Sequence, residues 1–337
     1  MQAVPWASLP SGSVQACAVV EAMQILNRSY LGRVATRIKT EAYRFHHSRA
    51  ATGVLATAPL HRGSLRCAVL SMVSRSDVLA YLVAVKSFCH FAPAERIVVL
   101  CDRSITQQDR DVIATHVPFV EFLHVKDYVV ANLPVGGCWE RLHALASLAA
   151  DAFVVQLDSD TVTTAPVEEV LRAVHNRAAF MMGVESDQRF LSMAAMRKRT
   201  DSHAEKLSTS HIHDVVEYFL PRLGYDDSFL YTTGWAAFSA FPPDRSMLLQ
   251  LFDLVARLRS VVGVRLDEWG SEMVASNFLA SNAARCHVLP FPKYSTPLTP
   301  EPNVHLAHFV GSHRFRNNRY ASQTQRAIQV LLKERKL

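Results

Sequence analysis

The stretch that decides the fold of this chain is VVQLDSDT, residues 154–161. Its first four residues predict a short buried strand, and two carboxylates, Asp158 and Asp160, follow one residue apart. Ligands of open α/β sheets bind outside the carboxyl ends of the strands, so both side chains are expected to face a crevice. Two carboxylates this close repel each other unless a cation lies between them. Oxygen ligands suit Mn²⁺ or Mg²⁺, so the stretch predicts a divalent-metal site that could hold a diphosphate.

Apolar runs and helical patterns alternate on both sides of this strand. We expect strands at residues 67–73, 96–101, 119–125 and 153–157, with helices at 77–91, 106–116 and 139–151 between them. This alternation predicts an α/β fold with a mostly parallel, Rossmann-like central sheet and helices on both faces. The later pattern is less regular, with strands expected at 180–184, 235–241 and 304–309 and helices at 244–261, 272–280 and 323–336. The polar segment 186–214 is expected to be a long loop or a mobile helical insert.

The charge of the chain is uneven. The formal net charge is +6, and residues 27–66 contain eight Arg and Lys residues but only one acid, Glu41. A basic helical arm of this kind suits an anionic membrane surface, nucleic acid or a charged partner, or it is a solvated face. We expect no nucleic-acid partner, because the arm lacks interleaved aromatic residues and any known motif. The predicted organisation is a basic arm and linker (1–63), a catalytic domain (64–322) and a basic C-terminal helix (323–337). Within the first part, the pattern predicts a helix at residues 13–49 and the linker at residues 50–63.

Cysteine usage and hydropathy bear on location. The six cysteines form no C-x-x-C pair, and several lie in apolar runs, which predicts free thiols in a reducing compartment. No apolar run approaches membrane-spanning length, and no positive segment precedes the first apolar stretch. The sequence therefore predicts a cytoplasmic protein, or one bound peripherally to the inner face of a membrane through the basic arm.

Two other enzyme classes share part of this pattern. An Asp-x-Asp after an apolar strand also resembles haloacid-dehalogenase-like phosphatases, in which Asp158 would be the nucleophile and Asp160 the acid/base. That motif normally follows the first strand of its domain, whereas three strand–helix units precede it here. A nucleotidyltransferase would carry a Gly-rich phosphate loop, and residues 71–77 contain no glycine.

Further groups of residues stand in order around the carboxylate pair. Arg141 lies on the expected helix just before the strand, and Thr233 and Gly234 precede the strand expected at 235–241. Near the C-terminus the sequence reads His308-Phe309-Val310-Gly311, followed by His313 and Arg314. With these landmarks, residues 67–319 resemble GT-A fold glycosyltransferases that use nucleotide-diphospho-sugars, most closely glycosyltransferase family 8 (glycogenin-like and bacterial lipopolysaccharide galactosyltransferase-like enzymes).

The resemblance implies a role for each landmark. Asp158, Asp160 and His308 would bind Mn²⁺ or Mg²⁺. The residues that would contact the donor are Arg141, Asp158, Ser159, Asp160, Thr233, Gly234, Gly311, His313 and Arg314. Glu272, with Asp267 and Arg141, would act at the reacting centre. Thr232 stands where the family usually has Asn, and Met273 stands where it usually has Gln.

The implied reaction is transfer of a sugar, a hexose with UDP as the favoured carrier, to an unidentified saccharide, lipid-linked or protein acceptor. By the same resemblance, the anomeric configuration would be retained; in an inverting enzyme, Glu272 or Asp267 would instead be the base for the acceptor hydroxyl. Segment 186–214 is the candidate for the acceptor side. The alternatives are the phosphatase and a catalytically inactive sugar-nucleotide-binding protein.

Overall fold

The computed structural model describes residues 34–296 and 303–334. Its centre is a seven-stranded sheet in the order β10-β6-β9-β4-β1-β2-β3, in which only β9 runs against the other strands. The strands are β1 (Leu65–Val73), β2 (Ala94–Cys101), β3 (Val120–His124), β4 (Val154–Leu157), β6 (Phe180–Met182), β9 (Trp235–Phe241) and β10 (His287–Leu289). The predicted mostly parallel central sheet is confirmed.

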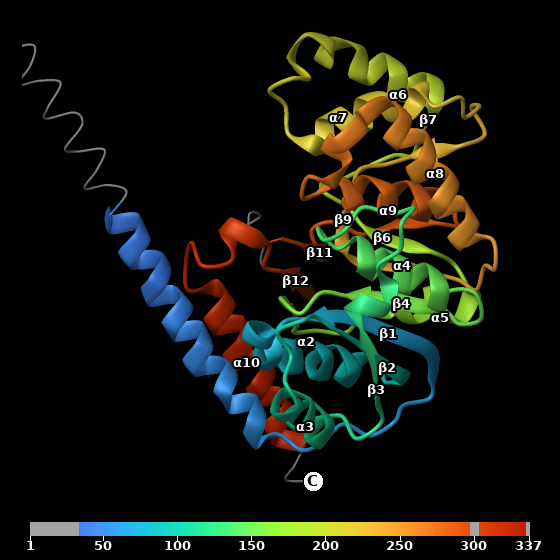
Figure 1. Cartoon of the computed structure of the whole chain (residues 1–337). Coiled ribbons are helices and arrows are strands. Elements are labelled where there is room, and N and C mark those ends of the chain that lie inside the picture. The colour runs from blue at the N-terminus through green and yellow to red at the C-terminus, as the bar shows by residue number, and fades with distance from the viewer. Residues whose placement is uncertain (1–33, 297–302, 335–337) are drawn as a thin grey trace, which may run out of the picture.

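Helices cover both faces of this sheet (Figure 1). Successive side chains of a strand point to opposite faces, and in β1 Val69 and Val73 join one core while Ala68 and Leu70 join the other. The first core includes α2 (Val78–Phe91), α3 (Gln107–His116), α5 (Glu168–Asn176) and α10 (Arg319–Glu334). The second core includes α4 (Trp139–Leu148), α8 (Met247–Val262) and α9 (Ser271–Asn282). Burial on both faces explains the nearly continuous apolar runs of the central strands.

A second, three-stranded sheet brings distant parts of the chain together. It consists of β11 (Tyr294–Ser295), β12 (Leu306–His308) and β5 (Thr161–Thr163), in that order. β12 pairs antiparallel with β5, so His308 lies opposite Thr161, and the Phe309 amide donates to the Asp160 carbonyl at 2.9 Å. The last strand therefore lies beside the residues that follow β4.

The segment expected to be a loop or helical insert is helical. It contains β7 (Leu191–Ser192), α6 (Met193–Thr200), η4 (Asp201–Lys206) and the start of α7 (Ile212–Phe219), and it is followed by η5 (Leu220–Arg222) and β8 (Leu230–Tyr231). Met196, Ile212 and Val216 are buried in the core shared with α8 and α9. The insert is therefore a packed part of the domain.

The C-terminal end of the N-terminal arm packs against the domain. Of the helix expected at residues 13–49, residues 13–33 lie outside the described chain, and the helix continues to residue 51. Residues 50–63, expected as a linker, are helical as far as Ala56, because η1 (Thr52–Ala56) follows directly and buries Val54. Figure 1 shows this blue helix running beside α10.

Other features bear on the expected location. Among the described residues, no helix has both the length and the apolar character needed to cross a membrane. The five described cysteines, Cys67, Cys89, Cys101, Cys138 and Cys286, are free thiols, and Cys17 lies outside the described chain.

The remaining short helices are η2 (Arg75–Asp77), η3 (Val125–Tyr128), η6 (Gly263–Asp267) and η7 (Gly311–His313).

A capping box starts α3 and supplies a test of the fold. The Thr106 hydroxyl accepts from the Asp109 amide at 3.3 Å, and the Asp109 carboxylate accepts from the Thr106 amide at 2.8 Å. Thr106→Ala removes half of this box, so we expect a loss of about 1 kcal/mol in the free energy of unfolding, measured by urea denaturation. Thr115→Ala, on the exposed side of the same helix, is the control and should cost less. Equal losses in the two variants would contradict a capping role.

Candidate functional site

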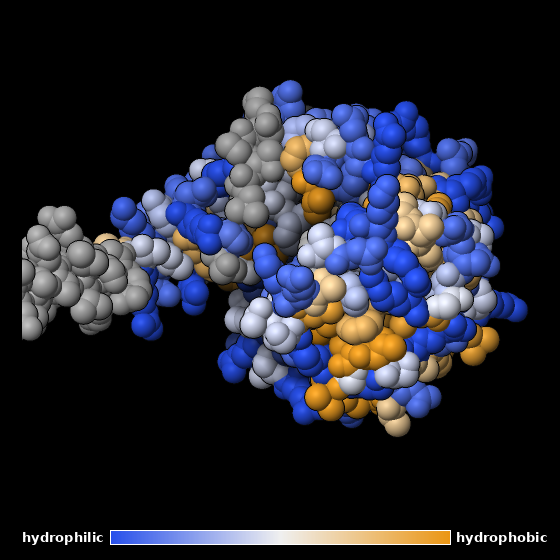
Figure 2. Space-filling model, turned by 90° about the horizontal axis from the view of Figure 1, so that it is seen from above, coloured by the Kyte–Doolittle hydropathy of each residue, from blue (hydrophilic) through white to orange (hydrophobic). Residues whose placement is uncertain are grey.

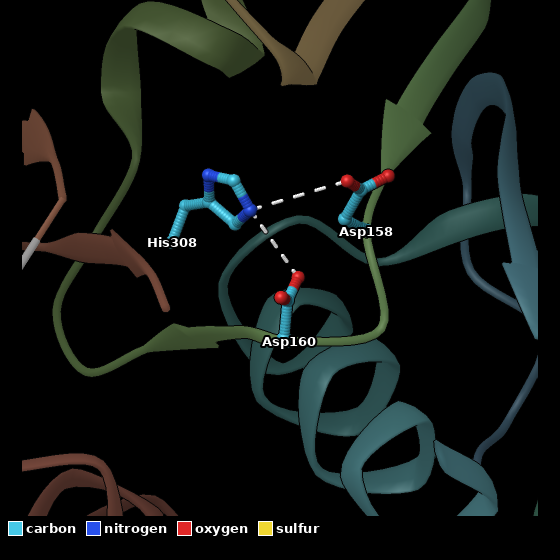
Figure 3. Close-up of side chains that lie close together, drawn as sticks. All are labelled: Asp158, Asp160 and His308. Atoms are coloured by element: carbon cyan, nitrogen blue, oxygen red, sulfur yellow. Dashed lines mark ion pairs between the residues drawn. The ribbon is translucent and has the colours of Figure 1, made fainter. Parts of the chain in front are cut away.

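Three predicted metal ligands converge at the carboxyl edge of the central sheet. Asp158 and Asp160 lie in the turn between β4 and β5, and His308 ends β12 (Figure 3). His308 Nε2 lies 3.3 Å from Asp160 Oδ1 and 4.0 Å from Asp158 Oδ2. One ligand atom from each residue lies within 4.8 Å of the others. Two carboxylate oxygens and an imidazole nitrogen at this spacing fit a divalent cation such as Mn²⁺.

Each of the two aspartates also accepts a hydrogen bond from an arginine. Arg141, buried on α4, donates to Asp158 Oδ1 and also to Glu272, at 3.3 Å and 3.4 Å. Arg314, just after η7, donates to Asp160 and to Asp77, the latter at 3.1 Å. Four carboxyl groups thus share two guanidinium groups, Arg141 and Arg314, and this excess of acid favours a further cation.

Burial and these partners set the protonation of the acids. Burial raises the pKa of Asp158, against the opposing effect of Arg141. Burial alone would also raise the pKa of Asp160, but His308 and Arg314 outweigh it and lower that pKa well below its usual range. Burial raises the pKa of Glu272 to about 7, because the nearby Arg141 offsets only part of the desolvation. Asp160 is therefore the firmly ionised member of the cluster.

The cluster lines a cleft of about 320 Å³. Ser74 and Asp102 line it just beyond the carboxyl ends of β1 and β2, as expected for a ligand site in a parallel sheet. Trp235, Trp269 and Met273 supply apolar walls. A larger cavity, of about 720 Å³, lies at the opposite, amino ends of β1, β2 and β4 and contains none of the predicted site residues.

Most of the predicted site residues lie in the cleft. Besides the three metal ligands, it is lined by Arg141, Ser159, Glu272, Gly311 and Arg314. Asp267 does not line this cleft; its exposed carboxylate pairs with Arg259 at 2.8 Å and 2.9 Å. Thr233 and His313 also lie outside the lining, and the Thr233 hydroxyl donates to Glu217 at 2.9 Å.

Gly234 is explained by packing rather than by access to a ligand. A Cβ at this position would lie 2.6 Å from Met181 Cε and 3.0 Å from the Met182 carbonyl oxygen. Asn277 Nδ2 donates to the Gly234 carbonyl at 3.0 Å, which holds α9 against β9. The glycine thus allows the chain to approach β6 closely, whereas the sequence suggested close approach to a donor.

Asp77 and Asp102 are site residues that the sequence reasoning missed. Asp77 occupies the N-cap position of α2, but its side chain forms no capping bond and instead pairs with Arg314. Asp102 follows the last residue of β2 directly. The rule that identified Asp158, a carboxylate at a strand end, would also have identified Asp102, whereas Asp77 lies four residues after the end of β1, in η2.

No protein-family model matches this sequence, and no curated protein is significantly similar to it. Several solved structures are similar in architecture. An active-site mutant of LgtC is 13% identical with a TM-score of 0.49, over 78% of this chain and 95% of that chain. The galactosyltransferase LgtC in complex with donor and acceptor sugar analogues is 14% identical with a TM-score of 0.43, over the same 78% and 95%. Core-mannan synthase A from Aspergillus fumigatus, in a Mn/GDP form, is 10% identical with a TM-score of 0.39, over 69% of this chain and 75% of that chain. At these identities and TM-scores, the similarities assign neither a family nor an activity to this chain.

Proposed function

We propose that this chain is a metal-dependent glycosyltransferase of GT-A type that moves a sugar from a nucleotide-diphosphate donor to an acceptor. The observation that carries the proposal is the convergence of Asp158, Asp160 and His308 beside Arg141 and Arg314 in one cleft. Carboxylates alone would suit many metal enzymes. An imidazole and two arginines beside them suit a site that must also bind the phosphates of the donor.

The chain's own residues would stabilise the departing diphosphate. Sugar transfer breaks the bond between the anomeric carbon and a phosphate oxygen, through a transition state with oxocarbenium character. A bound divalent cation would neutralise part of the negative charge on the leaving group. Arg314 is half-buried and lines the cleft, and its guanidinium donates to Asp160, Asp77 and the Phe309 carbonyl, so its remaining N–H groups would be the ones to contact phosphate oxygens. Arg141 lies deeper and orients Asp158 and Glu272.

Glu272 is proposed to act at the sugar end of the donor. Its carboxyl lies in the cleft, on the first turn of α9, and contacts Arg141. A buried carboxyl with a pKa near 7 can exchange between neutral and charged forms as ligands enter. We further propose, from the sequence resemblance, that the donor is a UDP-sugar carrying a hexose and that transfer retains configuration.

The acceptor is proposed to enter between the helical insert and the loop before α9. His213 of α7, part of the segment expected on the acceptor side, lines the cleft together with Trp269 and Gly270. Gly270 has φ of +102°, and a Cβ there would lie 2.3 Å from His213 Nε2, so only glycine allows this approach. No observation favours the phosphatase alternative, since Arg141 occupies one oxygen of the required nucleophile, Asp158.

Turnover should depend on a divalent metal. The purified chain should release nucleotide from a UDP-, GDP- or ADP-sugar with Mn²⁺ and stop in EDTA. Asp158→Asn and Asp160→Asn should each lower kcat/KM by about 100-fold or more, because the leaving group loses its metal. The matched control is Asp267→Asn, outside the cleft, which should retain activity. Phosphate release from p-nitrophenyl phosphate without any sugar-nucleotide turnover would instead establish a phosphatase.

His308 should contribute to the affinity of the site for metal. His308→Ala should weaken Mn²⁺ binding by roughly tenfold or more, because it removes one ligand of three. Electron paramagnetic resonance of free Mn²⁺ measures this without substrate. His313→Ala is the control, since that imidazole does not line the cleft. Equal affinities for the wild type and His308→Ala would remove His308 from the site.

Glu272 should make the stability of the chain depend on pH. The pKa of this carboxyl is about 7 in the folded chain and about 4.5 in the unfolded chain, so its ionisation disfavours the folded state. Its contribution to the free energy of unfolding is therefore fully present below pH 4.5 and is lost as the pH rises through 7. Glu272→Gln removes this loss. In EDTA, the free energy of unfolding of the variant should therefore gain on the wild type between pH 5 and 8, by on the order of 3 kcal/mol. Parallel stability profiles of the two proteins across this range would show that Glu272 is not perturbed.

A further inference from the structure

The helix of residues 34–51 uses only one face to contact the domain. Tyr43 is half-buried on that face, and His47 is buried, with its ring stacked on Tyr320 at a centroid distance of 3.6 Å. Arg44 lies over the ring of Phe315, 5.3 Å from its centroid. These contacts fix the rotation of the helix and so determine which side chains face away from the domain.

An apolar row occupies the opposite face. Val34, Ile38 and Phe45 are spaced four and seven residues apart, which places them within one narrow arc of a helix with 3.6 residues per turn. Their exposed fractions are 37%, 64% and 66%. Within residues 34–296 and 303–334, then, the structure leaves this row uncovered. Large apolar side chains in a row on a solvent-facing helix indicate a contact surface.

Basic residues border the row on both sides. At 100° per residue, Arg37 and Arg44 lie on one side of it and Arg49 lies on the other. All three are exposed. The one acid of this helix, Glu41, lies on the same face as the row, between Ile38 and Phe45, and 3.7 Å from Arg44. Figure 2 shows the helix projecting from the body, with hydrophilic residues prominent on the face in view. An apolar row with cationic borders is the pattern of a helix that lies in the plane of a membrane interface.

We propose that residues 34–51 bind the surface of an anionic lipid membrane. Ile38 and Phe45 would enter the acyl boundary, and the arginines would lie at the level of the anionic headgroups. The occupant is inferred from charge complementarity, because Arg37, Arg44 and Arg49 border the row and Glu41 is the one acid among residues 34–51. The contact uses no residue of the metal cleft. Loss of membrane binding would therefore leave sugar-nucleotide turnover in solution intact, and the two proposals can fail independently.

Co-sedimentation of the full chain with vesicles tests this inference. The wild type should bind vesicles of phosphatidylglycerol and phosphatidylcholine in equal parts, should not bind phosphatidylcholine alone, and should dissociate at high salt. The double variant Ile38→Glu, Phe45→Glu should lower the bound fraction by about tenfold or more. Leu249→Glu, which places a new acid at a side chain that is 69% exposed on α8, is the matched control and should bind like the wild type.

Three outcomes would overturn the proposal. The wild type could fail to bind the anionic vesicles, or the double variant could bind as well as Leu249→Glu. In the third, analytical ultracentrifugation without lipid would show a wild-type dimer that the double variant abolishes, with no vesicle binding by either protein, and the row would then be an interface between copies of this chain. Circular dichroism and sugar-nucleotide hydrolysis of the double variant would verify that its fold and cleft are unchanged.

Discussion

The antiparallel pairing of β12 with β5 is the contact on which the site depends. β4 delivers two carboxylates to the edge of the central sheet, but a metal site needs a further ligand from elsewhere. The pairing places His308 opposite Thr161, and the bond from the Phe309 amide to the Asp160 carbonyl fixes the separation of the two segments. Each of these strands has only three residues, so the small sheet needs support from its surroundings.

That support comes from side chains around β11. Lys293 pairs with Glu168 and Glu169 at 2.8 Å and 2.9 Å, and the Tyr294 hydroxyl donates to Glu169 at 2.8 Å. These contacts tie the small sheet to the start of α5, which packs on the central sheet. The position of His308 therefore rests on both sheets, although the residue itself belongs only to the smaller one.

How much of this could be predicted from the sequence depended on the kind of signal each residue gave. Apolar runs located the central strands, and the strand-end rule located Asp158 and Asp160. His308 came only from the family resemblance, because strand pairing between distant segments has no periodic signal. Asp267 and Glu272 are close in sequence, and only the geometry of the turn before α9 determines which one enters the cleft. Trp269, on that same turn, gave no signal at all.

The stack of His47 on Tyr320 connects the N-terminal helix to the surroundings of the candidate metal site. Tyr320 stacks in turn on Phe309, with ring centroids 4.2 Å apart, and Phe309 follows His308 directly in the chain. Three aromatic rings thus form a continuous column from the N-terminal helix to the residue beside His308. A chain that begins after residue 51 would lack His47, so the face of the Tyr320 ring that His47 covers would be exposed to water. The N-terminal helix, although it projects from the domain, thus packs against the residues that support the candidate metal site.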